Sequence, residues 1–179
     1  MIRRILIVTL PIALAACGRS EDSNQAQQTT PTNSETGAVT QTSASGDPCR
    51  ALTDPAAIFG QPATAHTATM PNNTHTCEWR VAGDRTCGTL VVFGPGWNEV
   101  ANVPANYEGM VTSLKAFGDV KEVTGVGEEA RAVDGGILGA QLAFRTNDVA
   151  ALVGATCGTA ERSSAALAES LARAVAENL

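Results

Sequence analysis

Hydrophobic and polar residues divide the chain into three stretches. An apolar run from Ile5 to Leu14 follows Arg3 and Arg4. Residues 18–47 are rich in Ser, Thr, Gln and Asn and contain no aromatic residue. Such a stretch cannot bury enough apolar surface to offset the entropy of ordering, which predicts a disordered tether. From Pro48 onward, apolar residues recur at the intervals of strands and helices. The pattern predicts a leader, a tether with one cysteine at its start, and a single folded domain, over residues 1–16, 17–47 and 48–179 respectively.

The periodicities within the domain predict short strands and a few helices. Runs of alternating character, bounded by turn residues, predict the strands, at 76–81, 86–93, 120–124, 130–133, 137–145 and 149–156. A capping side chain before proline predicts helical turns at Asp47-Pro48 and Asp54-Pro55. Longer helices are predicted from Pro104 to about Phe117 and after a Thr159 cap, with residues 61–75 left as a loop. One stripe of the first of these helices is apolar, at Tyr107, Met110, Val111 and Leu114. This order predicts an α+β fold, in which an antiparallel sheet of about five to six strands carries helices mainly on one face.

The first predicted hairpin assigns side chains to the two faces of the sheet. A turn at 82–85 places Arg80 opposite Cys87 and Cys77 opposite Leu90. Alternation then directs a set of apolar side chains to one face and Cys87 to the other. The apolar set is Cys77, Trp79, Val81, Leu90 and Val92.

The leader ends in Leu14-Ala15-Ala16-Cys17-Gly18. A positive start, a short apolar centre and small residues before the cut are the marks of an export signal. A cysteine directly after the cut resembles the lipobox of bacterial lipoproteins. That resemblance implies cleavage before Cys17 and lipidation of the cysteine, with a diacylglycerol on its thiol and a fatty acid such as palmitate on its amino group. The apolar run of about ten residues is shorter than the roughly twenty that span a bilayer. An ordinary secretory signal would not need the cysteine.

The tether and the charge limit where the domain acts and what it binds. A flexible chain of this length has a root-mean-square span of roughly 30 Å, which holds the domain just clear of the headgroups. Gly18 after the cysteine resembles lipoproteins sent to the periplasmic face of the outer membrane. In residues 48–179, nine Lys and Arg against fourteen Asp and Glu leave a formal charge of −5. Without a basic cluster, the domain is not expected to bind nucleic acid or anionic headgroups.

Four cysteines remain in the domain once Cys17 is set aside. An even number in an exported domain indicates two disulfides, for which three pairings exist. Because the predicted hairpin puts Cys77 and Cys87 on opposite faces, we favour the pairs Cys49–Cys77 and Cys87–Cys157. The spacings contain no C-x-x-C, so metal binding by these cysteines is not expected.

Several short motifs together resemble a known group of secreted domains. They are Asp47-Pro48-Cys49, Cys77-Glu78-Trp79 and Gly125-Val126-Gly127-Glu128-Glu129-Ala130. The combination resembles bacterial lipoprotein domains of unknown function, best known from actinobacteria, and is similar in plan to the extracellular sensor domains of PknH-type kinases. The resemblance implies a disulfide-stabilised α+β domain with a binding or sensing role, and it supplies no catalytic residue.

Residue types that carry chemistry are few. His66 and His75 lie in or beside the predicted loop without a carboxylate between them, so no metal site is expected. The serines of the predicted helices stand in no G-x-S-x-G motif, which argues against a hydrolase. Glu128 and Glu129 are adjacent on an extended segment and should face opposite ways, so they are not expected to form an acid–base pair. No cofactor or catalytic residue is predicted.

Aromatic residues are the candidates for binding. Trp97, beside Gly94-Pro95-Gly96, is expected to be partly exposed, and Tyr107 lies on the next predicted helix. Aromatic side chains anchor many recognition surfaces, although packing explains such residues equally well. The sequence therefore predicts a lipid-anchored, non-enzymatic envelope domain that binds a small molecule or an envelope protein. The alternatives are a structural or assembly factor of the envelope and, with less support, a hydrolase.

Overall fold

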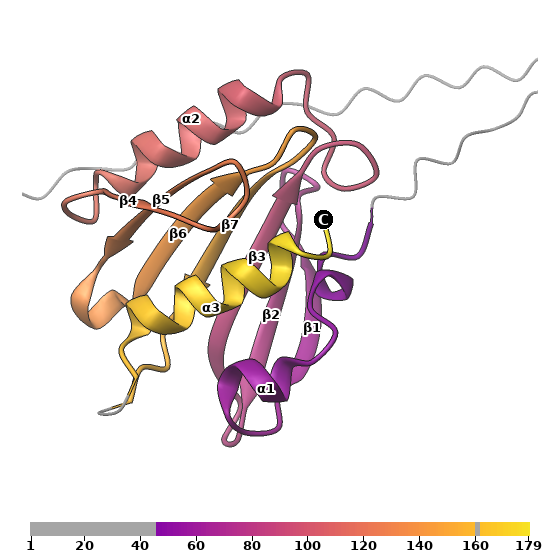
Figure 1. The fold of residues 1–179 in the computed structure, drawn as a ribbon. Helices are drawn as coiled ribbons and strands as arrows, with labels where there is room; N and C mark the ends of the chain where they lie inside the picture. The colour runs from indigo at the N-terminus through magenta and orange to yellow at the C-terminus, as the bar shows by residue number, and fades with distance from the viewer. Residues whose placement is uncertain (1–45, 160–161) are drawn as a thin grey trace, which may run out of the picture. The chain divides into compact units, whose positions relative to one another are not determined.

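The strands form one antiparallel sheet in a computed structural model that describes residues 46–159 and 162–179 (Figure 1). Its strands are β1 (Thr64–Thr69), β2 (His75–Val81), β3 (Arg85–Phe93), β4 (Lys121–Val123), β5 (Glu129–Asp134), β6 (Ala140–Arg145) and β7 (Ala150–Ala155). In the described residues the order across the sheet is β1-β2-β3-β7-β6-β5-β4, with every neighbouring pair antiparallel. The predicted α+β class is confirmed, with seven strands in place of about five to six.

Helices cover both faces of this sheet. They are the 3-10 helices η1 (Pro48–Ala51) and η2 (Gly136–Leu138) and the α-helices α1 (Pro55–Phe59), α2 (Val103–Leu114) and α3 (Ser164–Ala176). Figure 1 shows α3 lying across the strands on one side of the sheet. η1 and α1 contact α3 on that side, whereas α2 packs against β5, β6 and β7 from the opposite side. The prediction of helices mainly on one face therefore describes η1, α1 and α3, and α2 is the exception.

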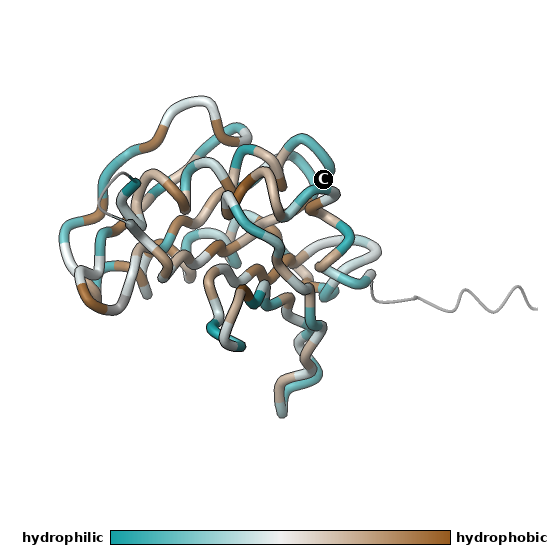
Figure 2. Tube along the Cα trace, turned by 90° about the horizontal axis from the view of Figure 1, so that it is seen from below, coloured by the Kyte–Doolittle hydropathy of each residue, from teal (hydrophilic) through white to brown (hydrophobic). Residues whose placement is uncertain are grey.

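Strand β6 shows how alternation divides the interior between two apolar clusters. Leu142 and Phe144 pack in the larger cluster with Leu171 of α3. Ala143, between them in the chain, packs in the smaller cluster with Tyr107 of α2. Successive side chains of a strand point to opposite faces, so this one strand supplies both cores. Figure 2 shows hydrophobic and hydrophilic residues mixed along the traced chain.

The first strand was expected to be part of a loop. Residues 64–69 read Thr-Ala-His-Thr-Ala-Thr, and all six are exposed. Pairing with β2 makes them a strand at the edge of the sheet. Because neither face of β1 is buried, its sequence carries no alternation of apolar and polar residues. Hydropathy therefore could not identify it.

The β2–β3 hairpin has the predicted inner face and a different register near the turn. Cys77 lies opposite Leu90 as predicted, but Arg80 pairs with Thr86, not with Cys87. The register shifts between Trp79 and Arg80. Cys87 is the extra residue of this β-bulge, so simple alternation does not assign its side chain to a face. The predicted inner set is buried, at Cys77, Trp79, Val81, Leu90 and Val92.

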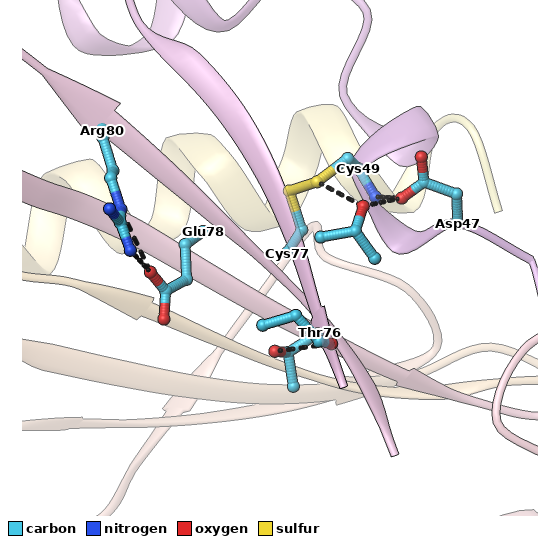
Figure 3. Close-up of a disulfide and its surroundings, with 8 residues drawn as sticks. Asp47, Cys49, Thr76, Cys77, Glu78 and Arg80 are labelled. Atoms are coloured by element: carbon cyan, nitrogen blue, oxygen red, sulfur yellow. Dashed lines mark hydrogen bonds and ion pairs between the residues drawn. A yellow bond between two sulfur atoms is a disulfide. The ribbon is translucent and has the colours of Figure 1, made fainter. Parts of the chain in front are cut away.

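Both favoured disulfides are present, joining Cys49 to Cys77 and Cys87 to Cys157. The first ties η1 to the second strand of the sheet, and Figure 3 shows Asp47 beside it. The Asp47 side chain accepts a hydrogen bond from the Cys49 backbone N–H at 3.0 Å. The second bridge links the bulge of β3 to the residues that follow β7.

Several predicted boundaries differ in the structure: the helix predicted from Pro104 to about Phe117 is α2, Val103–Leu114, and two further differences have a clear physical reason. The last helix is capped by Ser163, whose hydroxyl accepts from the Ala166 N–H, while the Thr159 hydroxyl accepts from the Arg162 N–H, before the helix begins. The sixth strand begins at Ala140, since η2 and then Gly139 at φ 82° interrupt the extended chain before it. A glycine is favoured at that positive φ because a Cβ would be strained there. In the part of the chain that the structure describes, no helix has the length and apolar character needed to cross a bilayer.

Candidate functional site

A groove lies between α2 and the sheet on the face opposite α3. It has a volume of about 680 Å³. Its lining comprises Phe93 and Leu152 from the sheet, Val100, Ala101 and Asn102 from the loop before α2, and Ala105, Asn106, Gly109, Met110 and Ser113 from α2. Because α2 packs on β5, β6 and β7, Phe93 of β3 lies beside the part of this face that α2 covers.

The wall of the groove follows from the amphipathic character of α2. Asn102 caps the helix by accepting a hydrogen bond from the Ala105 N–H at 3.0 Å. Tyr107, Met110 and Leu114 are buried against the sheet, as their helical spacing predicted. Residues with small side chains recur every fourth position along the groove, at Ala105, Gly109 and Ser113. The side of α2 that lines the groove therefore carries small side chains at these three positions and does not fill the space above the sheet.

Gly109 is the least expected residue of this wall. A glycine within a helix costs about 1 kcal/mol relative to alanine. Its φ is not positive, and a Cβ built on it would meet no atom within 4 Å. Neither backbone conformation nor packing within the described chain therefore requires glycine here. The missing side chain keeps the groove open.

The loop at the end of the groove is held by Asn98. Its side-chain oxygen accepts from the His75 N–H at 2.6 Å, and its Nδ2 donates to the carbonyls of His75 and Val92, each at 2.8 Å. The Gly94 N–H donates in turn to the Asn98 carbonyl at 2.9 Å. These bonds fix the segment that leads to Val100 and so position one end of the groove.

A smaller hollow of about 180 Å³ continues the floor along β7. Leu152 lines both hollows, and Thr89, Gln141 and Thr156 line the smaller one. Gly154 keeps the floor low, since a Cβ there would lie 2.5 Å from the Thr89 hydroxyl. Hydroxyl and amide groups therefore follow the apolar part of the groove.

The two hollows are uncharged although the chain is acidic. Among the described residues that line them, none is Asp, Glu, Lys or Arg. The whole chain carries a formal charge of −6. A charged ligand would lose hydration in the groove and gain no opposite charge, so the lining favours an uncharged, mainly apolar ligand.

Charged side chains gather elsewhere, at the start of β5 and the end of β6. Arg145 bridges Glu128, at 3.3 Å, and Glu129, at 3.2 Å. Arg131 also contacts Glu129, at 3.3 Å. The expectation that the two adjacent glutamates face opposite ways is wrong here: Glu128 precedes the strand, after Gly127 at φ 56°, and both carboxylates reach one guanidinium. These are partly exposed ion pairs, of which each contributes about 0–1 kcal/mol.

The two aromatic binding candidates do not form one surface. Tyr107 is only 1% exposed, within the cluster beneath α2. Burial, and next the charge of Glu129, raise the pKa of Tyr107 to about 12. Its hydroxyl has no hydrogen-bond partner among the described residues. Trp97 is half-buried, packs against the other cluster, and has Gly46 against its ring. Tyr107 therefore packs beneath α2, and its selection as a binding residue stays a prediction.

The other residues singled out from the sequence have separate places. Cys17 lies outside the described residues. His66 is in β1 and His75 begins β2, where its Nδ1 lies 3.1 Å from the Thr69 hydroxyl. Within residues 46–159 and 162–179, no three His, Cys, Asp or Glu side chains are grouped to hold a metal ion.

Sequence reasoning missed the groove itself. Phe93, Met110 and Leu152 read as ordinary core residues, and only the fold leaves their edges open. The available signal was Gly109, an isolated glycine in a predicted helix, where glycine costs about 1 kcal/mol relative to alanine. Comparison of the chain with protein-family models, with curated proteins and with solved structures finds no significant match.

Proposed function

We propose that this chain is a lipoprotein of the bacterial cell envelope whose domain binds an uncharged amphiphile, with an acyl chain in the groove beside α2. The proposed location in the envelope rests on the leader, which contains Arg3 and Arg4, the apolar run and Cys17 after the small residues. Lipidation would hold the chain at a membrane, and the tether would hold the domain near it. Two disulfides in the domain support an oxidising compartment.

The uncharged groove is the single observation that carries the proposed binding role. Its apolar floor at Phe93 and Leu152 suits a hydrocarbon chain. The amides of Asn102 and Asn106 suit the ester or hydroxyl groups of a neutral head. The groove is open along its length, which suits a chain that lies along the helix. The proposed role is binding, without catalysis.

Gly109 allows a sharp test. Gly109→Leu adds a side chain directly into the groove, where a Cβ meets no atom of the protein. Gly109→Ala adds one methyl group and serves as the matched control. Thr112→Leu adds a comparable apolar group to an exposed position of α2 outside the lining, and controls for general effects of hydrophobicity.

The measurement is native mass spectrometry of each variant, extracted from its own membrane in mild detergent and titrated with a monoacylglycerol. The wild-type chain should carry or accept one such molecule. Gly109→Leu should weaken binding tenfold or more, equivalent to about 1.4 kcal/mol. Gly109→Ala and Thr112→Leu should stay within about threefold of wild type, equivalent to roughly 0.7 kcal/mol. Equal binding by Gly109→Leu would reject the groove as the site, and no binding by any variant would reject the ligand class.

The proposed lipid anchor at Cys17 has its own test. The mass of the N-terminal peptide should show cleavage before Cys17 and the added acyl groups. Cys17→Ser should abolish that modification. An unmodified Cys17 in the mature wild-type chain would contradict the lipoprotein assignment, whatever the groove binds.

A further inference from the structure

The outer edge of the sheet at β1 is unprotected. All six residues of β1 are exposed, and none is charged or proline. The opposite edge, β4, has three residues, of which Lys121 and Glu122 are charged. Short, charged edges discourage pairing with another chain, whereas a longer uncharged edge presents free backbone groups. The two edges of this sheet are therefore of different kinds.

The hydrogen-bond pattern shows which groups β1 presents. The Met70 N–H donates to the Thr74 carbonyl at 2.8 Å. Bonded pairs alternate along an antiparallel ladder, so residues 64, 66 and 68 direct their backbone groups toward β2. The N–H and C=O groups of Ala65, Thr67 and Thr69 then point away from the sheet. They form a regular row of donors and acceptors along the edge.

This edge is held in place from the face that carries α3. The Thr67 hydroxyl donates to the Asp47 carboxylate at 2.6 Å and lies 3.5 Å from the Cys49 sulfur. Cys49 is bridged to Cys77, the partner of Thr67 in β2 (Figure 3). The middle of β1 is therefore tied through Asp47 to a disulfide. Less conformational entropy is then lost when another strand binds.

We propose that β1 pairs with the β1 of a second copy of this chain, antiparallel and centred on Thr67. In this register Ala65 lies opposite Thr69, and His66 opposite Ala68, of the other copy. No like charges meet, and every outward residue of β1 finds an outward partner. The sheets of the two copies become one continuous sheet related by a two-fold axis.

The position of Asp47 favours a second copy over an unrelated strand. A two-fold axis through the sheet keeps each face on the same side in both copies. Asp47 lies on the α3 face beside Thr67, so Asp47 of both copies would lie on the same side of the joined sheet, close to the axis. That arrangement suits two anchors in one membrane. The inference rests here on the proposed lipid anchor, which would also raise the effective concentration of one copy around another.

The test is photo-cross-linking of the full chain in its own membrane, with a photo-reactive residue in place of Thr64. The expected product has twice the mass and contains this chain alone. The same group in place of Ala116, an exposed residue after α2, should give no such product. A cross-link to a different protein, or no cross-link from position 64, would overturn the proposal.

Charged residues introduced at the edge test the register and the identity of the partner together. His66→Lys with Ala68→Lys places lysine opposite lysine twice, which should reduce the cross-linked product at least fivefold. His66→Lys with Ala68→Glu places opposite charges together twice and should keep or increase it. Equal yields from the two variants would contradict pairing centred on Thr67.

A backbone variant provides a second line of evidence. Ala65→Pro removes an outward N–H while sparing the ladder to β2, and should abolish the product; Ala65→Val keeps the donor and should retain it. Formation of both disulfides in each variant checks folding. Gly109→Leu should leave the cross-link unchanged, and the mass of the Cys17 peptide is read on the same sample. These readouts therefore distinguish a failure of strand pairing from a failure of groove binding and from a failure of lipidation at Cys17.

Discussion

The side chain of Asn98 hydrogen-bonds both backbone groups of His75, although the two residues are 23 apart in sequence. The side-chain amide of Asn98 pairs with His75 as a residue of a neighbouring strand would, because it offers one acceptor and one donor to the backbone at the start of β2. Its second donor contact is the carbonyl of Val92 in β3. One polar side chain therefore fastens the loop that bounds the groove to two strands.

Asn98→Ala should destabilise the domain by about 2 kcal/mol, since three bonds worth roughly 0.5–1.5 kcal/mol each are lost. Chemical denaturation of wild type and variant measures the difference. Asn98→Asp should cost at least as much, because a carboxylate oxygen would then face two carbonyls. Asn147→Ala, at an exposed turn residue, should change stability by less than about 0.5 kcal/mol. An unaffected Asn98→Ala would mean that the loop is held in another way.

Gly88 is the next position where the structure predicts a clear effect. A Cβ there would lie 2.7 Å from Phe59 Cζ and 3.1 Å from Leu171 Cδ2. Gly88→Ala should therefore cost about 1–3 kcal/mol through overpacking. Adding Phe59→Leu removes the tip of the ring, so the double variant should lose less stability than the sum of the two single losses, measured by thermal unfolding.

Gly109→Ala, with open space around the new methyl, should instead stabilise the domain by about 0.5–1 kcal/mol.

Tyr107→Phe should leave stability unchanged or raise it by up to about 1 kcal/mol, because the hydroxyl that it removes is buried and unpartnered within the described residues. Tyr107→Leu should destabilise, since it removes ring packing beneath α2. Urea denaturation at neutral pH compares the two variants. A loss on Tyr107→Phe similar to that on Tyr107→Leu would show that the hydroxyl has a stabilising partner.

The raised pKa of Tyr107 also predicts a dependence on pH. The folded domain holds this proton more tightly than the unfolded chain, whose tyrosine has a pKa of 10.0. Stability from this source is complete below pH 10 and falls as the pH rises toward about 12. Denaturation between pH 9 and pH 11.5 should therefore show a steeper loss for wild type than for Tyr107→Phe. Parallel curves would contradict the assigned shift.

The disulfides should behave as two independent units. Cys49→Ala and Cys77→Ala should each cost roughly 2–5 kcal/mol, and the double variant no more than either single change. Cys49→Ala combined with Cys157→Ala should give additive losses, since it opens both bridges. Denaturation under non-reducing conditions checks both statements. The bridge of sequence separation 70 should contribute somewhat more than that of separation 28, because it closes the longer loop.

Particular residues show how far sequence reasoning reaches. The inner face of the first hairpin could be read from Cys77, Trp79 and Leu90, because burial on one side enforces alternation. The bulge at Cys87 could not, since an inserted residue leaves the local pattern of alternation nearly unchanged. The favoured disulfide pairing is present nevertheless, although the hairpin register from which it was inferred was wrong near Cys87.

Candidate binding residues were harder to identify than the fold. Tyr107 was selected as a scarce aromatic residue, yet it is buried where α2 meets the sheet. Residues that read as core, such as Phe93 and Leu152, line the groove instead. Hydropathy reports that a residue prefers burial, but it does not report which part of a buried surface the neighbouring helix leaves open.

By itself, the sequence determined the α+β class, the inward face of the first hairpin and the stripe of α2, because these follow from repeats of two and 3.6 residues. Only the tertiary structure decided that α2 and α3 take opposite faces, that residues 64–69 join the sheet as an edge, and that a groove remains beside Gly109. These features depend on contacts between segments far apart in the chain. No local pattern of polar and apolar residues encodes them, because the same helix stripe fits either face of a sheet.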